Sequence, residues 1–312
     1  ARHYRETYGC DVSPDRIVVT TGSSGGFVLA FLALFEPGDR VAVAVPGYPP
    51  YRHILTALGC EPVLIETTSA TRHALTGEML LDAHRKTPLK GVLVASPANP
   101  TGTMMTSEAL GSLIEAADSE GIRFISDEIY HGLVYQDRAH SILEYTDKAF
   151  VINGFSKLYA MTGWRLGYLI FPKRFTAVMQ RIHQNFMISA NAFIQWAGIA
   201  ALTRSRKDVA KMVKTYDERR RYMLDRLRDM GFTIHVEPTG AFYVFADGRR
   251  FFTDSYREAF RITEEAKVGV TPGIDFGSGG EGFLRFSYAT SLENIKEGLN
   301  RLEKYLKRKS NH

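Results

Sequence analysis

Short apolar runs alternate with helical patterns over the first half of the chain, and this alternation constrains the fold more than any other feature. Each run is rich in aliphatic and aromatic residues and is too short to be a helix, which indicates a buried strand. Strands that alternate with helices form a mostly parallel sheet with helices on both faces. The predicted strands are residues 17–20, 41–45, 62–65, 91–95, 124–126, 149–152 and 166–171.

The segments that follow these strands are rich in glycine, proline and polar residues. Ligands of parallel sheets bind at the carboxyl ends of the strands, so we expect these segments to meet in one site. They are residues 21–26, 46–51, 96–102, 127–130 and 153–167.

The pattern changes after residue 171. Residues 206–230 predict a long, highly charged helix of the kind that bridges domains, after a mainly helical stretch at 175–201. We therefore expect a large domain of residues 1–205 and a smaller C-terminal α/β domain of residues 206–312. The further elements predicted in the smaller domain are strands at 233–236, 241–246 and 283–288 and helices at 255–266 and 292–306.

Composition excludes several classes of protein. With 312 residues, of which 45% are hydrophobic, the chain can bury a large core. It has no apolar run of roughly 18 residues and no signal-peptide pattern, so we expect a soluble protein without a membrane partner. Its two cysteines, Cys10 and Cys60, suit a reducing compartment, so we expect a cytoplasmic location. The net charge of +5 is scattered rather than clustered, and the nine histidines show no ligand spacing, so we predict neither nucleic-acid binding nor a metal site.

Three charged residues at strand ends point to chemistry. Lys157 follows the strand at 149–152, where partial burial and a nearby fixed cation favour a neutral amine that can form a Schiff base. Arg165, eight positions later, suits a phosphate. Asp127 ends another buried strand, where a carboxylate is costly unless it has a partner.

Residues 153–167, NGFSKLYAMTGWRLG, resemble the lysine segment of the class I/II aminotransferases, which are pyridoxal-phosphate-dependent enzymes of fold type I. The resemblance implies a three-layer α/β fold, with a seven-stranded, mostly parallel sheet in a large cofactor-binding domain and a smaller C-terminal domain. It also implies that Lys157 holds pyridoxal 5'-phosphate as a Schiff base and later moves the proton from the substrate's Cα.

Further motifs resemble this family in the same order along the chain. Residues 21–26 resemble its phosphate loop, 96–102 (SPANPTG) contain its NPTG string, and 127–130 (DEIY) supply an acid for the ring nitrogen and a hydroxyl for the ring oxygen. Arg285 matches the arginine that grips the substrate's α-carboxylate. The implied catalytic residues are Lys157, Asp127 and Tyr130; the implied cofactor ligands are Gly22, Ser23, Ser24, Tyr48, Asn99, Asp127, Tyr130, Ser156, Lys157 and Arg165; the implied substrate ligands are Asn99 and Arg285.

Each motif taken singly has a simpler interpretation. A Ser/Gly turn before a helix is usually only a cap, and Tyr48 alone is more typical of a packing residue. Asn99 before a proline is common in turns, and Arg285 alone suits a surface salt bridge at a strand edge. The agreement of all motifs in order is what favours the aminotransferase family.

The chain departs from the family's pattern in two places. Many relatives have serine three positions before the lysine, where this chain has Gly154, so Ser156 and Arg165 are expected to carry more of the phosphate contact. The chain begins at Ala1 within a helical pattern, and we expect the family's N-terminal segment to be missing. Residues 277–282 match GxGxxG formally, but they precede a strand, so we reject a dinucleotide site there.

The predicted function is transfer of an amino group between an L-amino acid and a 2-oxo acid. Two alternatives stay open, namely a β-lyase on the same scaffold and an aminotransferase-like sensor domain of a transcription regulator. We expect a homodimer, because relatives complete each pocket with residues of the partner and because the segments 44–51 and 186–192 are strongly apolar.

Overall fold

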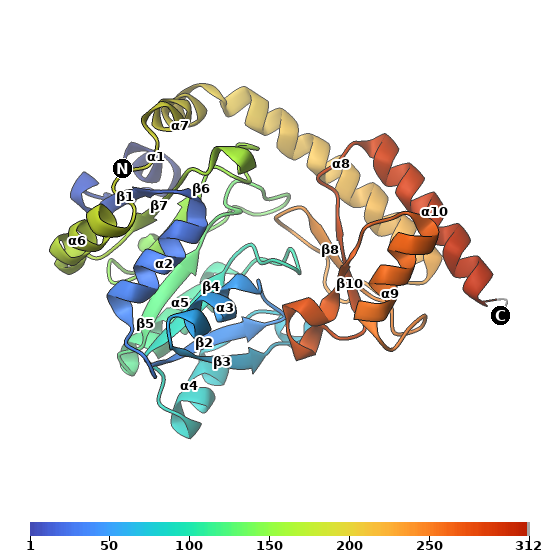
Figure 1. Ribbon diagram of the computed structural model, residues 1–312, viewed down its shortest axis with the longest axis horizontal. Coiled ribbons are helices and arrows are strands. Elements are labelled where there is room, and N and C mark those ends of the chain that lie inside the picture. Colours follow the sequence, from blue (N-terminus) through green and yellow to red (C-terminus); the bar gives the residue numbers. More distant parts are fainter. Residues whose placement is uncertain (311–312) are drawn as a thin grey trace.

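The computed structural model describes residues 1–310 and contains two β-sheets connected through a long helix (Figure 1). The strands are β1 (Ile17–Thr20), β2 (Arg40–Val45), β3 (Glu61–Glu66), β4 (Gly91–Ala95), β5 (Arg123–Asp127), β6 (Phe150–Gly154), β7 (Gly167–Ile170), β8 (Tyr243–Asp247), β9 (Thr271–Pro272) and β10 (Phe283–Ser287). The helices are α1 (Arg2–Tyr8), α2 (Gly22–Leu34), α3 (Pro50–Ala57), α4 (Gly77–Lys86), α5 (Ser107–Ser119), α6 (Thr176–Phe186), α7 (Ala192–Arg204), α8 (Arg206–Met230), α9 (Ser255–Arg261) and α10 (Leu292–Ser310).

The larger sheet has the strand order β1-β7-β6-β5-β4-β2-β3. Neighbouring strands from β3 to β6 are parallel, and β7 is antiparallel to both of its neighbours. The register pairs Ala95 with Asp127 and Asp127 with Ile152. The carboxyl ends of β4, β5 and β6 therefore meet at one edge, and the predicted seven-stranded, mostly parallel sheet is confirmed.

Helices cover both faces of this sheet, because successive side chains of each strand point to opposite sides. On one face, Leu93 and Ile125 join the core formed with α2, α3 and α6. On the other, Val92 and Phe124 join the core formed with α1, α4 and α5. Both faces are apolar, which explains why the strands read as continuous hydrophobic runs.

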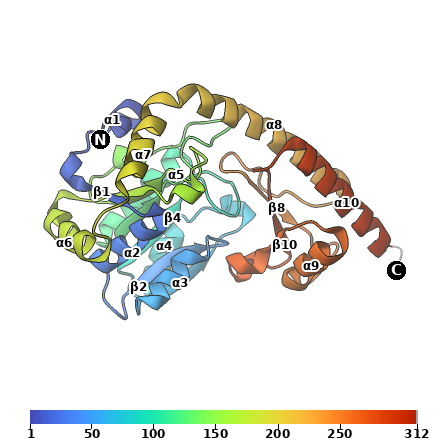
Figure 2. The same ribbon diagram turned by 45° about the horizontal axis from the view of Figure 1, so that its top comes forward.

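The smaller sheet is antiparallel, with the order β8-β10-β9. It packs against α8, α9 and α10 through a separate core that includes Leu227, Val244, Leu284 and Leu302. Helix α8 starts directly after Ser205, which ends α7, and both views show it extending from the large sheet to the small one (Figures 1 and 2).

Some predicted elements are wrong. Residues 233–236 form no strand; Thr233 makes only an isolated bridge to Asp247, because no further partner strand extends there. The Ser/Gly segment at 21–26, which the sequence predicts as a turn before a helix, instead forms the start of α2, which begins at Gly22. The helix at 255–266 ends as α9 at Arg261 and continues as a single π-helical turn. Strand β9 was not predicted, since its two residues form no apolar run.

Among the helices of residues 1–310, none combines the length and apolar character that a membrane crossing requires. Within the same residues, no three His, Cys, Asp or Glu side chains are grouped so that they could hold a metal ion.

Candidate active site

One cavity of about 300 Å³ lies at the carboxyl edge of the large sheet and extends to the small sheet. It brings together ten of the eleven predicted site residues, and the eleventh, Gly22, lies against Arg165. The lining residues are Ser23, Ser24, Phe27, Tyr48, Tyr51, Asn99, Asp127, Ile129, Tyr130, Ser156, Lys157, Thr162, Arg165, Tyr243 and Arg285.

Lys157 lies three residues beyond the end of β6 and is half-buried. Its Nζ is 5.9 Å from the centre of the Tyr130 ring and 5.7 Å from that of Phe242. Burial lowers the pKa of the Lys157 ammonium, and the charges of Arg285 and Arg165 lower it further, while Asp127 opposes them. The amine is therefore more readily deprotonated than that of an exposed lysine, as a nucleophile requires.

Asp127 is the last residue of β5 and is 3% exposed. Its Oδ2 accepts a hydrogen bond from the Tyr51 hydroxyl, and its Oδ1 accepts one from the backbone N–H of Ile129 at 3.1 Å. Burial nevertheless raises the pKa of the carboxyl to about 6. A cationic group in the cavity would stabilise its ionised form.

Backbone amides, hydroxyls and a guanidinium converge where α2 begins. A Cβ added at Gly22 would lie 2.6 Å from Nη2 of Arg165, so this guanidinium rests directly on the first turn of α2. A Cβ at Gly167 would lie 2.6 Å from the carbonyl carbon of Gly22 and 2.7 Å from the amide nitrogen of Ser23. The glycine in β7 thus lets the helix N-terminus approach the sheet closely. Such an arrangement suits a phosphate.

The glycine that replaces the family's serine also has a packing reason. A Cβ at Gly154 would lie 3.1 Å from the carbonyl oxygen of Leu166 and 3.2 Å from the Cα of Gly167. These neighbours are backbone atoms and cannot turn away. The site therefore leaves little room for a serine at this position.

Arg285 lies on β10, the central strand of the small sheet, and not at a sheet edge. Its Nη1 donates to Oδ1 of Asn99 at 2.7 Å, and its Nη2 donates to the Thr271 hydroxyl at 3.1 Å. Its buried Nε has no hydrogen-bond partner in the structure. Within residues 1–310 no carboxylate forms an ion pair with Arg285, so the alternative of a surface salt bridge is not supported.

The sequence interpretation missed two tyrosines. Tyr51 hydrogen-bonds to Asp127, 76 positions away, and the Tyr243 hydroxyl lies 2.9 Å from that of Tyr130, 113 positions away. No sequence pattern near either tyrosine indicates its contact, because only the folded sheet brings these distant segments together. Glu128, next to Asp127, is fully buried and accepts hydrogen bonds from Tyr4 and other groups outside the cavity.

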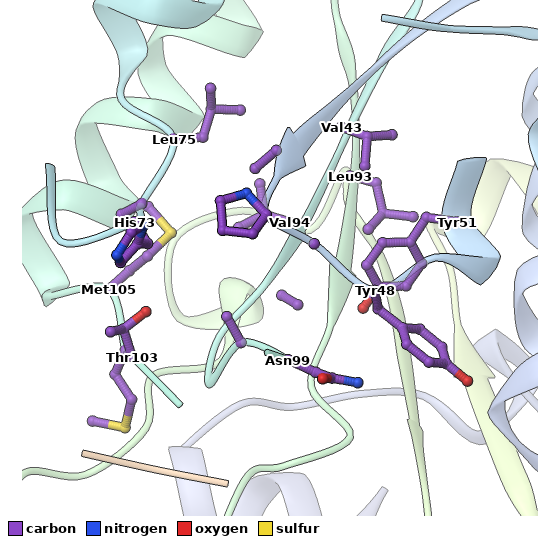
Figure 3. A pocket seen from close by; sticks show the side chains of 17 residues that line it. Val43, Tyr48, Tyr51, His73, Leu75, Leu93, Val94, Asn99, Thr103 and Met105 are labelled. Carbon is purple, nitrogen blue, oxygen red and sulfur yellow. The ribbon is translucent and has the colours of Figure 1, made fainter. Parts of the chain in front are cut away.

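A smaller cavity of about 30 Å³ adjoins the site. Tyr48, Tyr51 and Asn99 line both cavities. In Figure 3, His73 and Met105 lie across the smaller cavity from the two tyrosines. It has room for about one or two water-sized groups and is lined largely by apolar side chains.

Residues 1–302 match the family described as "Aminotransferase class I and II". The chain is 43% identical to valine–pyruvate aminotransferase of Mycobacterium tuberculosis, over 98% of this chain and 79% of that protein. It is 37% identical to aspartate aminotransferase of Thermotoga maritima, over 98% and 79% of the two chains. The crystal structure of an aminotransferase from Mycobacterium tuberculosis superimposes with a TM-score of 0.94 at 43% identity, covering 99% of this chain and 80% of that one.

The chain therefore belongs to the class I and II aminotransferases. The predictions of a fold-type I architecture and of a pyridoxal-phosphate-dependent transaminase are confirmed at this level.

Proposed function

We propose that this chain transfers an amino group between an L-amino acid and a 2-oxo acid, with pyridoxal 5'-phosphate held by the residues of the large cavity. The observation that carries the proposal is the convergence in that cavity of a lysine with a lowered pKa, a buried acid that forms no ion pair within residues 1–310, and the amide-rich start of α2 beside a guanidinium. When bound, the cofactor supplies an electron sink for the bond broken at the substrate's Cα.

The residues present fit that cofactor. Asp127 would hold a proton on the ring nitrogen, and the resulting cation would stabilise the buried carboxylate. The first turn of α2, with Gly22, Ser23 and Ser24, would bind the phosphate together with Ser156 and Arg165. Tyr48 would stack on the cofactor ring. The Tyr130 hydroxyl and the Asn99 amide would donate hydrogen bonds to the ring oxygen.

Substrate handling would fall to Lys157 and Arg285. Arg285 would orient the α-carboxylate through its planar fork, assisted by Asn99, which already contacts it. Lys157 Nζ, with its lowered pKa, would take the proton from the substrate's Cα and deliver it to the cofactor carbon that bonds the transferred nitrogen.

Donors with an uncharged side chain are the substrate class that we favour. The relative named valine–pyruvate aminotransferase supports this choice. So does the charge inventory, since Lys157, Arg165 and Arg285 are the basic residues among the described residues that line the cavity, and each already has a proposed partner. A screen of amino donors against pyruvate and 2-oxoglutarate tests this, with ammonia release measuring β-lyase activity. Turnover confined to acidic donors, or ammonia release without dependence on an oxo acid, would contradict it.

A homodimer completes the proposal. Segment 44–51 does not support it, because Val45 and Tyr51 are buried within the chain. The support comes from α6, α7 and the segment between them, which expose large apolar side chains, with Ile188 81% and Trp196 72% exposed. The others are Val178, Phe186, Phe193, Ile199 and Leu202.

Dilution tests the homodimer. The molecular mass from light scattering and the specific activity should fall together along one dilution series. Trp196→Glu should move both of these decreases to a higher protein concentration. A fully active monomer would contradict the homodimer.

We also propose two finer points of organisation. The boundary between residues 1–205 and 206–312 coincides with the junction of α7 and α8 at Ser205, although residues 311–312 lie outside the described part. Limited proteolysis followed by mass spectrometry tests that boundary. A cytoplasmic location suits the free thiols of Cys10 and Cys60 and is tested by cell fractionation.

A further inference from the structure

Tyr243, the first residue of β8, contacts two groups that act on different parts of the reaction. It is 5% exposed and lines the large cavity. Its hydroxyl lies 2.9 Å from the hydroxyl of Tyr130, and the centre of its ring lies 4.2 Å from the guanidinium carbon of Arg285. One side chain therefore joins the proposed cofactor contact to the proposed substrate contact.

The ring of Tyr243 fixes the plane of Arg285. A guanidinium stacked on an aromatic face keeps its N–H groups directed outward in the plane of the fork. Phe276 also contacts this guanidinium, with its ring centre at 5.0 Å. Asn99 and Thr271 accept from the two terminal nitrogens. The aromatic contacts set the plane, and the hydrogen bonds set the rotation within it.

Either hydroxyl of the Tyr130–Tyr243 pair can donate, and the direction of this hydrogen bond decides where the proton of Tyr130 points. Tyr130 is buried, and its pKa is raised first by that burial and then by the neighbouring Tyr243, so it stays a neutral phenol. When Tyr243 donates to the oxygen of Tyr130, the proton of Tyr130 is free to point into the cavity. The charged groups around Tyr130 are Asp127, Lys157 and Arg285.

We propose that Tyr243 is a positioning residue with two separable effects. Its ring holds Arg285 flat for the substrate carboxylate, and its hydroxyl donates to Tyr130 and so directs the Tyr130 proton to the cofactor's ring oxygen. This inference rests on the proposed function, because it assigns a partner to each of two residues in that site.

Two substitutions separate the effects. Tyr243→Phe keeps the ring and removes the hydroxyl, so the affinity for amino acid and oxo acid should stay within about twofold. The pH midpoint of the visible absorbance of the cofactor-loaded protein should rise by about 0.5, since the ring oxygen loses support from the hydrogen-bond chain. Tyr243→Leu removes the ring as well, so binding of the unreactive probe 2-methylalanine, measured by absorbance titration, should also weaken about tenfold.

Tyr305→Phe is the control, because it removes a buried hydroxyl that donates to Glu258 in the core around α9 and α10. It should change neither the midpoint nor the probe affinity. An unchanged midpoint in Tyr243→Phe would overturn the role of the hydroxyl, and unchanged probe affinity in Tyr243→Leu would overturn that of the ring. If the wild-type protein forms no visible band with pyridoxal phosphate, the proposed function itself fails; a normal band with unresponsive Tyr243 variants refutes only this inference.

Discussion

Replacement of Asp127 by asparagine should stabilise the cofactor-free protein at alkaline pH. Burial raises the pKa of this carboxyl from 3.8 to about 6. Below pH 3.8 the acid is protonated in both states and costs nothing. As pH rises towards 6 the unfolded chain releases its proton first, so the native state loses stability, and above pH 6 the loss is complete. A gap of about two pH units corresponds to about 3 kcal/mol at pH 8 and to roughly half of that at pH 5.

Denaturant unfolding of cofactor-free wild type and Asp127→Asn at pH 5 and pH 8 measures this effect. Glu128 is buried beside it and has its pKa raised to about 7 by that burial. It is present in both proteins, and its charge is one of the smaller causes of the raised Asp127 pKa. Added pyridoxal phosphate should reverse the ranking, because it stabilises the native state in proportion to its affinity, and the variant offers the ring nitrogen no charge. A cofactor-free variant no more stable than wild type at pH 8, or an advantage that does not shrink at pH 5, would refute the reasoning.

Three further substitutions test the site. Lys157→Ala should abolish the visible band that pyridoxal phosphate forms with the protein, and a retained band would assign the attachment elsewhere. Arg285→Lys keeps the charge but loses the planar fork, so the Michaelis constants of amino acid and oxo acid should rise together by about tenfold; constants that stay the same would make Arg285 structural. Gly167→Ala places a Cβ 2.6 Å from the Gly22 carbonyl carbon, so it should cost about 1–3 kcal/mol and weaken cofactor affinity, whereas Gly163→Ala meets nothing within 4 Å and should not; equal affinities in equilibrium dialysis would contradict this.

The seven strands of the large sheet could be predicted from the sequence, and for β4, β5 and β6 the reason is that burial on both faces makes each one a largely apolar run. Helix α2 shows where this reasoning stops. Glycine and serine are poor helix formers, so the sequence favours a loop before Phe27, yet the helix starts at Gly22. Tertiary packing overrides local preference there, because the first turn rests on the backbone of Gly167 in β7.

The site residues likewise include some that the sequence could predict and some that it could not. Lys157, Asp127 and Asn99 follow strands, and their position alone indicates that they meet at one edge of the sheet. Tyr51 and Tyr243 could not be predicted, because their contacts depend on how α3 approaches β5 and how the small sheet approaches the large one. Those distances are set by packing between elements far apart in the chain, to which a motif gives no access.

The length of helix α8 converts a small rotation at its start into a large displacement at its far end. Its 25 residues extend about 37 Å at the usual rise of about 1.5 Å per residue. A rotation of only about 5° at Ser205 would therefore displace the far end of α8 by about 3 Å, which exceeds the tolerance of a hydrogen bond. The bonds from Arg285 to Asn99 and between Tyr130 and Tyr243 join groups of the two sheets across the cavity, so such a rotation would stretch each of them by an amount that grows with its distance from Ser205.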